Sequence, residues 1–214
     1  MSEAQKKAPE KKAKKSLLYA VAKPIAALLF KTFLPVKFHN REVLNGEPPF
    51  VLIGNHTSLM DPVIMGVGVK KHQVRFIGKK ELWKNKLVGA AFNSMNMIPV
   101  DRHNSDMEAM RACMRVTREG NILGIFPEGT RHHKGLMEEI ESGVALIALR
   151  SRVPVIPVYI SGKVALFRTL HVYVGDPIPT EDLREQGVNK ETCDLLLTRI
   201  TQTYARMHEA HTKA

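Results

Sequence analysis

A histidine and an aspartate stand close together in the stretch GNHTSLMDP (residues 54–62), where His56 precedes Asp61 by five residues. A five-residue step turns roughly 140° around a helix, and an odd step along a strand places two side chains on opposite faces. The two groups can therefore meet only if the chain between them turns. Pro62 favours the first position of a helix and disfavours helical dihedrals at the preceding residue. We therefore expect Asp61 to be the N-cap of a helix and residues 55–60 to form the turn.

An imidazole beside a carboxylate can take a proton from a hydroxyl group. The free imidazole has a pKa of ~6.5, and the carboxylate would hold one ring tautomer and stabilise the cation that forms. This pattern predicts that His56 is a general base oriented by Asp61. The spacing by itself also fits Asp61 as a simple helix cap and His56 as a hydrogen-bonded loop residue. The other polar clusters of the sequence are therefore needed to decide between a catalytic pair and these structural roles.

Three further polar clusters follow apolar runs that we expect to be strands. FPEGTR (126–131) combines a tight Pro/Gly turn with an arginine, whose planar guanidinium can bind a phosphate through two hydrogen bonds. Lys79 and Lys80 follow a second run, and Arg102 follows a third. Because ligands gather at the carboxyl ends of strands in open α/β folds, these clusters predict a pocket for a phosphorylated or otherwise anionic substrate. Taken singly, the FPEGTR turn also fits a salt-bridged surface turn, and the lysines fit a solvated surface.

Several common catalytic and metal-binding patterns do not occur in the sequence. It has no G-x-S-x-G motif for a serine nucleophile, no complete P-loop and no H-E-x-x-H zinc motif. Cys113 and Cys193 stand apart without a C-x-x-C pair, and HH (132–133) and HEAH (208–211) are more typical of surface histidines than of metal ligands. We therefore predict no metal site. A base without an enzyme nucleophile suggests that a hydroxyl group of the substrate attacks.

Short apolar runs alternate with helical patterns from residue 49 onward. Several of these runs lack inside/outside alternation, as expected for strands buried on both faces of a sheet. The order of elements predicts a single α/β domain with a largely parallel central sheet flanked by helices. The expected strands are 50–54, 74–78, 97–100, 122–126, 153–160 and 170–175. The expected helices are 62–69, 81–95, 105–119 and 138–150. Ser105 and Glu108 form a capping box for the third of these helices, and Asn189 can cap a final helix.

The N-terminal region combines a basic tail with an apolar helical pattern. Residues 1–15 hold six Lys and two Glu in a chain of net charge +11, and residues 16–36 repeat large apolar side chains at helical spacing. Lys23, Pro24 and Lys31 interrupt this segment, whose uncharged stretches are too short to span a bilayer. We expect a disordered basic tail followed by an amphipathic helix that lies in the interface of an anionic membrane. The alternative is an ordinary amphipathic helix packed on the core.

Three of these clusters and a later apolar run together resemble the motifs of a known family. NHTSLMD, the arginine of IPVDR, FPEGTR and VPVIPVYISG resemble, in order and spacing, the four motif blocks of the lysophosphatidate acyltransferases, within the wider glycerolipid acyltransferase group. The resemblance covers roughly residues 38–180. It implies an enzyme that moves a fatty acyl group from acyl-CoA or acyl-carrier protein to the free hydroxyl of lysophosphatidate and gives phosphatidate for phospholipid synthesis. It implies no cofactor and no metal.

The resemblance also implies roles for individual residues. His56 would be the general base and Asp61 would orient it. The substrate-binding residues would be those of the remaining clusters. Arg131 would hold the acceptor phosphate, in a turn shaped by Glu128 and Gly129 and shared with Thr130, and Arg102 would assist. Lys79 and Lys80 would contact phosphate on either substrate. Pro157 would belong to a strand that lines the acyl-donor side. The acyltransferase domain would comprise residues 37–182, followed by a C-terminal helical segment at 183–214.

One departure from the family pattern leaves the acceptor open. Many relatives carry a basic residue just before the glycine that opens the helix after FPEGTR, whereas this sequence reads EIESG and has Ser142 at that place. An acidic patch there would favour a zwitterionic lysophospholipid or an amino-lipid as acceptor.

A third interpretation is a non-catalytic basic protein that binds a membrane or a nucleic acid. Nucleic-acid binding needs exposed aromatic side chains for stacking, and the one Trp, four Tyr and eight Phe lie mostly within apolar runs. We therefore expect the protein to bind an anionic membrane surface and no nucleic acid. The expected location is the cytoplasmic face of a membrane, with monotopic or peripheral attachment.

Overall fold

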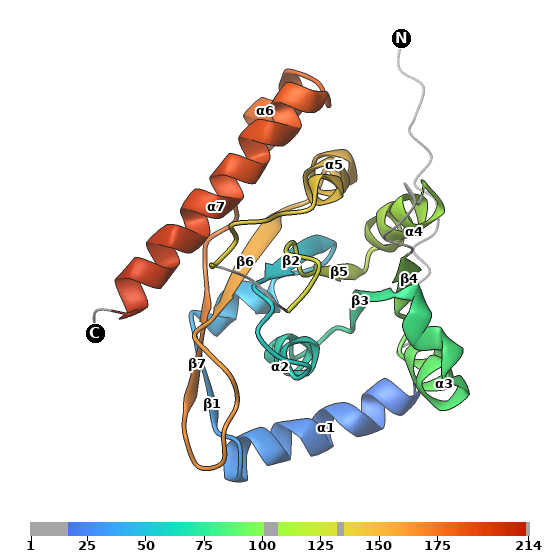
Figure 1. Cartoon of the computed structure of the whole chain (residues 1–214), viewed down its shortest axis with the longest axis vertical. Coiled ribbons are helices and arrows are strands. Elements are labelled where there is room, and N and C mark those ends of the chain that lie inside the picture. Colours follow the sequence, from blue (N-terminus) through green and yellow to red (C-terminus); the bar gives the residue numbers. More distant parts are fainter. Residues whose placement is uncertain (1–16, 101–106, 132–134, 213–214) are drawn as a thin grey trace.

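The computed structural model describes residues 17–100, 107–131 and 135–212 (Figure 1). Within these residues the chain forms a seven-stranded sheet of order β1-β7-β6-β2-β5-β3-β4. Every neighbouring pair is parallel except β6 and β7, so β1 and β7 run opposite to the other strands. The predicted single α/β domain with a largely parallel sheet is confirmed. The strands are β1 (Val36–His39), β2 (Phe50–Gly54), β3 (Val74–Lys79), β4 (Ile98–Val100), β5 (Ile122–Ile125), β6 (Val155–Ile160) and β7 (Leu170–Val174).

Helices cover both faces of this sheet (Figure 1). α1 and α2 pack on one face, and α4, α5, α6 and α7 contribute side chains to the core on the other. The α-helices are α1 (Leu17–Thr32), α2 (Asp61–Gly68), α3 (Lys86–Ser94), α4 (Met107–Arg118), α5 (Ser142–Ser151), α6 (Glu181–Glu185) and α7 (Lys190–Thr212). Two short 3-10 helices are η1 (Arg41–Asn45) and η2 (Lys80–Lys84).

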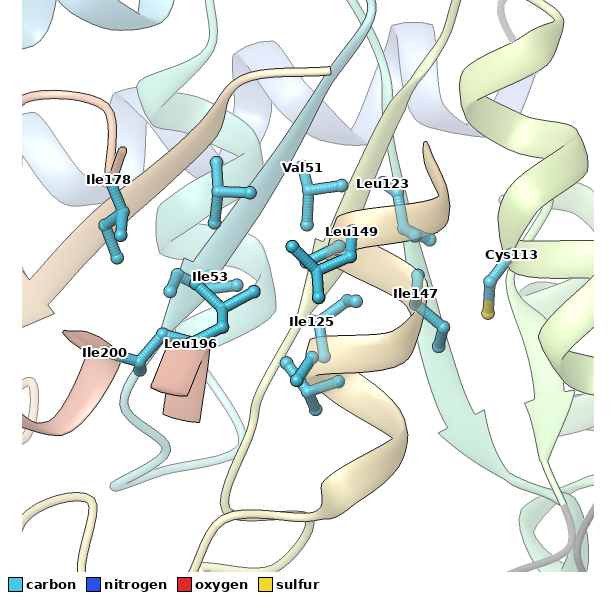
Figure 2. Packing of buried hydrophobic residues seen from close by; sticks show 14 of the residues in the cluster. Val51, Ile53, Cys113, Leu123, Ile125, Ile147, Leu149, Ile178, Leu196 and Ile200 are labelled. Atoms are coloured by element: carbon cyan, nitrogen blue, oxygen red, sulfur yellow. The ribbon is translucent and has the colours of Figure 1, made fainter. Parts of the chain in front are cut away.

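The central strands are apolar on both sides because helices cover both faces. All residues of β2 are buried: Leu52 packs in the same core cluster as α2, and Val51 and Ile53 pack with α5 and α7. Figure 2 shows Leu149 of α5 and Leu196 of α7 gathered beside Ile53. This double burial accounts for the absence of alternation in the sequence of the strand.

Differences between the predicted and observed elements have local causes. The predicted helix at 81–95 is divided into η2 and α3, because Asn85 between them has an extended backbone (φ −78°, ψ 114°). The Asn85 side chain accepts hydrogen bonds from the backbone N–H groups of Leu87 and Val88 and so starts α3 afresh. The short elements β1 and α6 are not predicted by the sequence pattern.

The predicted helix caps have different outcomes. Oδ1 of Asn189 accepts the backbone N–H of Thr192 at 2.9 Å, which confirms Asn189 as the residue that caps α7. Ser105 lies outside the described residues, and the described part of the third predicted helix, α4, begins at Met107.

α1 presents a row of large apolar side chains to solvent. Phe30 is the buried residue of this helix, and it lies in the same core cluster as α2. The exposed apolar side chains are Leu17, Leu18, Val21, Ile25, Leu28 and Leu29, followed by Phe33 just beyond the helix. Within the described ranges, no helix has the length and apolar character needed to cross a bilayer.

Candidate active site

Two polar turns meet at one edge of the sheet. β2 and β5 are parallel neighbours, with Ile53 opposite Ile125. β2 continues into residues 55–60, which we call the His56 turn, and β5 continues into residues 126–131, the FPEGTR turn. Because both strands end at the same edge, both turns leave the sheet side by side.

His56 and Asp61 are in direct contact. Nδ1 of His56 lies 2.9 Å from Oδ2 of Asp61. The Asp61 carboxylate is fully buried and also accepts hydrogen bonds from the backbone N–H groups of Thr57 (2.6 Å) and Ser58 (2.7 Å) and from the Ser58 hydroxyl (2.9 Å). These donors compensate the buried charge and hold the carboxylate in one orientation toward the imidazole.

The prediction that Asp61 is the N-cap of α2 is wrong. Asp61 is the first residue of the helix, and the preceding residue, Met60, occupies the cap position without a side-chain cap. The carboxylate instead points back into the His56 turn, where it accepts the N–H groups of Thr57 and Ser58. Its hydrogen bonds therefore shape the turn before the helix rather than the first turn of the helix itself.

The imidazole of His56 is held by packing as well as by the carboxylate. Its ring stacks on Phe126, with centroids 4.2 Å apart, and the Phe126 ring stacks in turn on Phe76. Because Nδ1–H donates a hydrogen bond to Asp61, Nε2 is the ring nitrogen that can accept a proton. The side chain is 16% exposed, so a substrate hydroxyl can reach it.

Glu128 joins the FPEGTR turn to the His56 turn. Its side chain is buried, Oε2 accepts the backbone N–H of His56 at 2.7 Å, and Oε1 accepts the backbone N–H of Met137 at 3.1 Å. Gly129, the next residue, has a positive φ of 67°, which a side chain would disfavour. The carboxylate of Glu128 thus accepts hydrogen bonds from the protein backbone. Through the N–H of His56 it fixes the position of the His56 main chain.

Further hydrogen bonds anchor the His56 turn to its other neighbour, β6. The Asn55 side chain donates to the carbonyl of Ile160 (2.9 Å) and accepts the N–H of the same residue (2.7 Å). The Thr57 hydroxyl donates to the carbonyl of Gly162 at 2.9 Å. On the opposite side of the sheet, the buried Tyr204 hydroxyl donates to the carbonyl of Ile53, at the end of β2. Burial raises the pKa of Tyr204 well above its ordinary value.

A cavity of about 840 Å³ opens beside His56. Phe126 and Gly129 form its wall near the histidine, and its other walls are mostly apolar side chains of α4 and α5 together with the first residues of α7. These apolar side chains include Met107, Met110, Cys113, Val144 and Ile147. The site therefore joins a base to a space that fits an extended apolar group. Among the described residues, no cluster of three or more His, Cys, Asp or Glu side chains is arranged to hold a metal ion.

The family model for acyltransferases matches residues 35–161 of this chain, which include both turns. The chain belongs to the acyltransferase family. A 1-acyl-sn-glycerol-3-phosphate acyltransferase of Bacillus subtilis is 30% identical over 152 residues, which are 69% of this chain and 75% of the relative. An enzyme with the same name from Streptococcus pneumoniae is 28% identical over 179 residues, which are 80% of this chain and 66% of the relative.

A solved structure has the same fold as this acyltransferase. The crystal structure of the 1-acyl-sn-glycerophosphate acyltransferase PlsC from Thermotoga maritima superimposes with a TM-score of 0.64 and 23% sequence identity. The match covers 90% of this chain and 77% of the other. The mostly parallel sheet and its flanking helices are therefore an arrangement that this chain shares with PlsC.

The residues predicted to contact the substrate phosphates take different positions in the acyltransferase. Thr130 and Arg131 are exposed at the end of the FPEGTR turn. Lys79 ends β3, with its ammonium 3.5 Å from Glu81, and Lys80 is exposed at the start of η2. Neither lysine is among the residues that line the cavity.

The two remaining predicted residues are Arg102 and Pro157. Arg102 lies outside the described residues. Pro157 is buried in the middle of β6, with Ile53 opposite it on β2, and it is not among the cavity-lining residues. The roles assigned to both residues remain predictions.

The structure adds a clamp at the far end of α2 that sequence reasoning missed. The ammonium of Lys23 donates hydrogen bonds to the carbonyls of Val69, Lys70 and His72, just beyond the C-terminus of the helix. Arg41 donates to the carbonyl of Gly68, at 2.8 Å. Cations at this end of a helix satisfy its last carbonyls and interact favourably with its dipole.

A tyrosine of α1 reinforces this clamp. The Tyr19 hydroxyl donates to the carbonyl of Gly66 at 3.2 Å, and a Cβ atom at position 66 would lie 3.2 Å from that hydroxyl oxygen. Glycine therefore permits the close approach of α1 to α2. Burial raises the pKa of Tyr19 to about 12. α1 is thus joined through polar contacts to the helix whose first residue is Asp61.

Proposed function

We propose that this acyltransferase transfers a fatty acyl group from a thioester donor, acyl-CoA or acyl-carrier protein, to the free hydroxyl of lysophosphatidate and so forms phosphatidate. The observation that carries the proposal is the His56–Asp61 pair at the mouth of an apolar cavity. The relatives named 1-acyl-sn-glycerol-3-phosphate acyltransferases support the choice of acceptor.

The proposed reaction uses His56 first as a base and then as an acid. Nε2 takes the proton of the acceptor hydroxyl as its oxygen attacks the carbonyl carbon of the thioester. The tetrahedral intermediate collapses, the carbon–sulfur bond breaks, and the departing sulfur receives the proton from the imidazolium. Asp61 stabilises this cation and keeps the required tautomer. A positioned base of this kind contributes ~10²–10⁴-fold to the rate.

The substrate-binding assignments extend this proposal. We assign the acceptor phosphate to the end of the FPEGTR turn, where Gly129 reaches the cavity and Thr130 and Arg131 are exposed. Arg102 and the two lysines after β3, Lys79 and Lys80, would add positive charge for phosphate groups. The acyl chain would occupy the apolar cavity, and Pro157 would support the donor side from within β6.

A second acceptor class is favoured by one observation. Glu141 is exposed, lines the same cavity as His56 and lies beside the FPEGTR turn, where its Oε1 would be 3.1 Å from a Cβ atom at Gly129. A carboxylate there would attract an ammonium group and repel a phosphate monoester. The second candidate is therefore a lysophospholipid or amino-lipid acceptor that carries an amine.

The proposal includes attachment to a membrane. α1 presents its apolar face to solvent and follows the lysine-rich residues 1–15, and these are the two signals that together give stable interfacial binding. We propose that α1 lies in the interface of the cytoplasmic leaflet. The catalytic unit would be residues 37–182, and the segment 183–214 contributes Leu183 and buried residues of α7 to its core.

Thiol release from acyl-CoA, with and without lysophosphatidate, tests this function. We expect release to require the acceptor and to fall at least about a hundredfold in His56→Ala, while His72→Ala, outside the site, retains wild-type rates. The same assay with acyl-carrier protein and with lysophosphatidylethanolamine identifies donor and acceptor. Full activity in His56→Ala would exclude the base mechanism. No transfer with any of these donors and acceptors would refute the proposed activity.

A further inference from the structure

The loop between β6 and β7 exposes two large apolar side chains at its tip. Leu166 is 66% exposed and Phe167 is 74% exposed. Phe167 has a positive φ of 57°, a backbone conformation that is unfavourable for a bulky residue. The backbone of the loop is therefore in an energetically unfavourable conformation at Phe167, the more exposed of the two residues. Such a cost is typical of functional positions rather than of residues left out of a core.

This loop lies beside the end of α1. The backbone N–H of Phe167 donates to the carbonyl of Phe33 at 2.9 Å, and the rings of these two residues are 6.3 Å apart. Figure 1 shows the loop reaching down next to the C-terminal end of α1. Leu28 and Phe33 are 62% and 51% exposed, so the tip of the loop continues the apolar face of the helix.

The charges around this apolar surface have one sign. Residues 17–41 and 161–175 contain four and two basic residues, respectively, and no Asp or Glu. Lys163 and Arg168 flank the exposed pair within the loop, and Lys31 is exposed on α1. A second copy of this chain would bring the same cations against them, whereas an anionic lipid surface complements them.

We propose that residues 163–168 form a second membrane-contact element, with Leu166 and Phe167 inserted into an anionic leaflet and Lys163 and Arg168 at its head groups. The inference rests on the proposed interfacial position of α1. It adds a contact point away from the axis of α1, so that the helix cannot rotate freely about that axis on the membrane.

This contact orients the active site. The loop begins at β6, and the carbonyl of Gly162 accepts the hydroxyl of Thr57 in the His56 turn at 2.9 Å. Insertion of the loop tip therefore brings the His56 turn towards the lipid surface. A lysolipid acceptor can then reach His56 from the leaflet in which it is dissolved.

The test compares three variants of the full-length chain by sedimentation with phosphatidylcholine vesicles that contain phosphatidylglycerol. Leu166→Ser/Phe167→Ser removes the loop contact, Val21→Ser/Leu28→Ser weakens the α1 contact, and Leu195→Ser changes an exposed leucine of α7. Burial of each large apolar side chain favours partitioning strongly enough that we expect the loop variant to bind at least about tenfold more weakly. Leu195→Ser should bind like the wild type. Circular dichroism and thermal unfolding check that the variants are folded.

A direct probe accompanies the binding assay. In Phe167→Trp, brominated lipids should quench the added tryptophan, measured as a difference from the wild type with its single Trp83. Turnover of short-chain lysophosphatidate below its micellar concentration should be unchanged in the loop variant, which separates this inference from the proposed chemistry. If the loop variant binds vesicles like the wild type and the added tryptophan is not quenched, the proposed membrane contact of the loop is wrong, even if the α1 variant loses binding. The membrane contact would also be refuted if the wild type is a dimer in the absence of vesicles and the loop variant is a monomer. The loop would then contact a second copy of the chain.

Discussion

Two buried carboxylates hold His56. Asp61 contacts the imidazole, and Glu128 accepts the backbone N–H of the same residue. Each carboxylate accepts further backbone N–H groups, which help to compensate its buried charge. The orientation of the base is therefore set jointly by side-chain and main-chain contacts. The sequence predicts the first of these contacts from spacing, but the second joins turns that are 72 residues apart and leaves no local pattern.

Asp61→Asn should separate the charge of this residue from its shaping of the turn. Nδ1 of His56 and the backbone N–H groups of Thr57 and Ser58 all reach Oδ2 of Asp61, so an amide oxygen at that place can keep these hydrogen bonds. The neutral amide, however, cannot stabilise the imidazolium that forms when His56 takes the proton of the acceptor. We expect kcat to fall on the order of a hundredfold or more and the free energy of unfolding to fall by about 1–3 kcal/mol.

The control for this prediction is Ser58→Ala. It removes the hydroxyl that donates to Asp61 at 2.9 Å and leaves the charge and the backbone donors in place. Its kcat should stay within a few-fold of the wild type. Equal turnover in wild type and Asp61→Asn would reduce Asp61 to a residue that only supports the turn.

At the scale of elements, α2 connects the candidate site to the N-terminal helix. Its first residue is Asp61, and the carbonyls beyond its last turn are bound by Lys23 of α1. In the sequence Lys23 only interrupts an apolar segment, because its partners lie 46 or more residues further along the chain. Long buried runs such as β2 are predictable from local composition, whereas β1, a four-residue strand at the edge of the sheet, has no such signal.

Lys23→Met should loosen the joint between α1 and α2. The methionine keeps the apolar part of the side chain but leaves the carbonyls of Val69, Lys70 and His72 without this donor. We expect the free energy of unfolding, measured by urea denaturation without lipid, to fall by about 1–3 kcal/mol. Lys31→Met, at an exposed position of the same helix, should change it by less than about 0.5 kcal/mol. Equal effects of the two substitutions would contradict the clamp.

At the scale of the whole molecule, the site depends on segments that sequence reasoning cannot bring together. The two turns are predictable, because strand order in an α/β fold places polar residues at one edge of the sheet. The cavity beside them is enclosed by α4, α5 and the start of α7, three segments whose packing against one another sets its depth. The far end of α7 also meets the sheet, through rings of α7, β1 and β7 that gather around Tyr173.

This ring cluster predicts how the stability of the molecule changes with pH. His39 stacks on Tyr173, and its Nε2 lies 2.9 Å from Nδ1 of His171. His211 also stacks on Tyr173, with centroids 3.6 Å apart. Burial lowers the pKa of His39, and the charges of His171, Lys37 and His211 lower it further.

Acidification should therefore destabilise the folded chain through His39. Because the pKa of His39 is lower in the folded state than the ~6.5 of an unfolded chain, the unfolded state binds more protons as the pH falls. The stabilising contribution is complete above about pH 6.5 and is lost as the pH falls through the folded-state pKa. In urea titrations the unfolding midpoint should decline less steeply with falling pH in His39→Gln than in the wild type. Identical slopes would show that protonation of His39 has no part in the pH dependence.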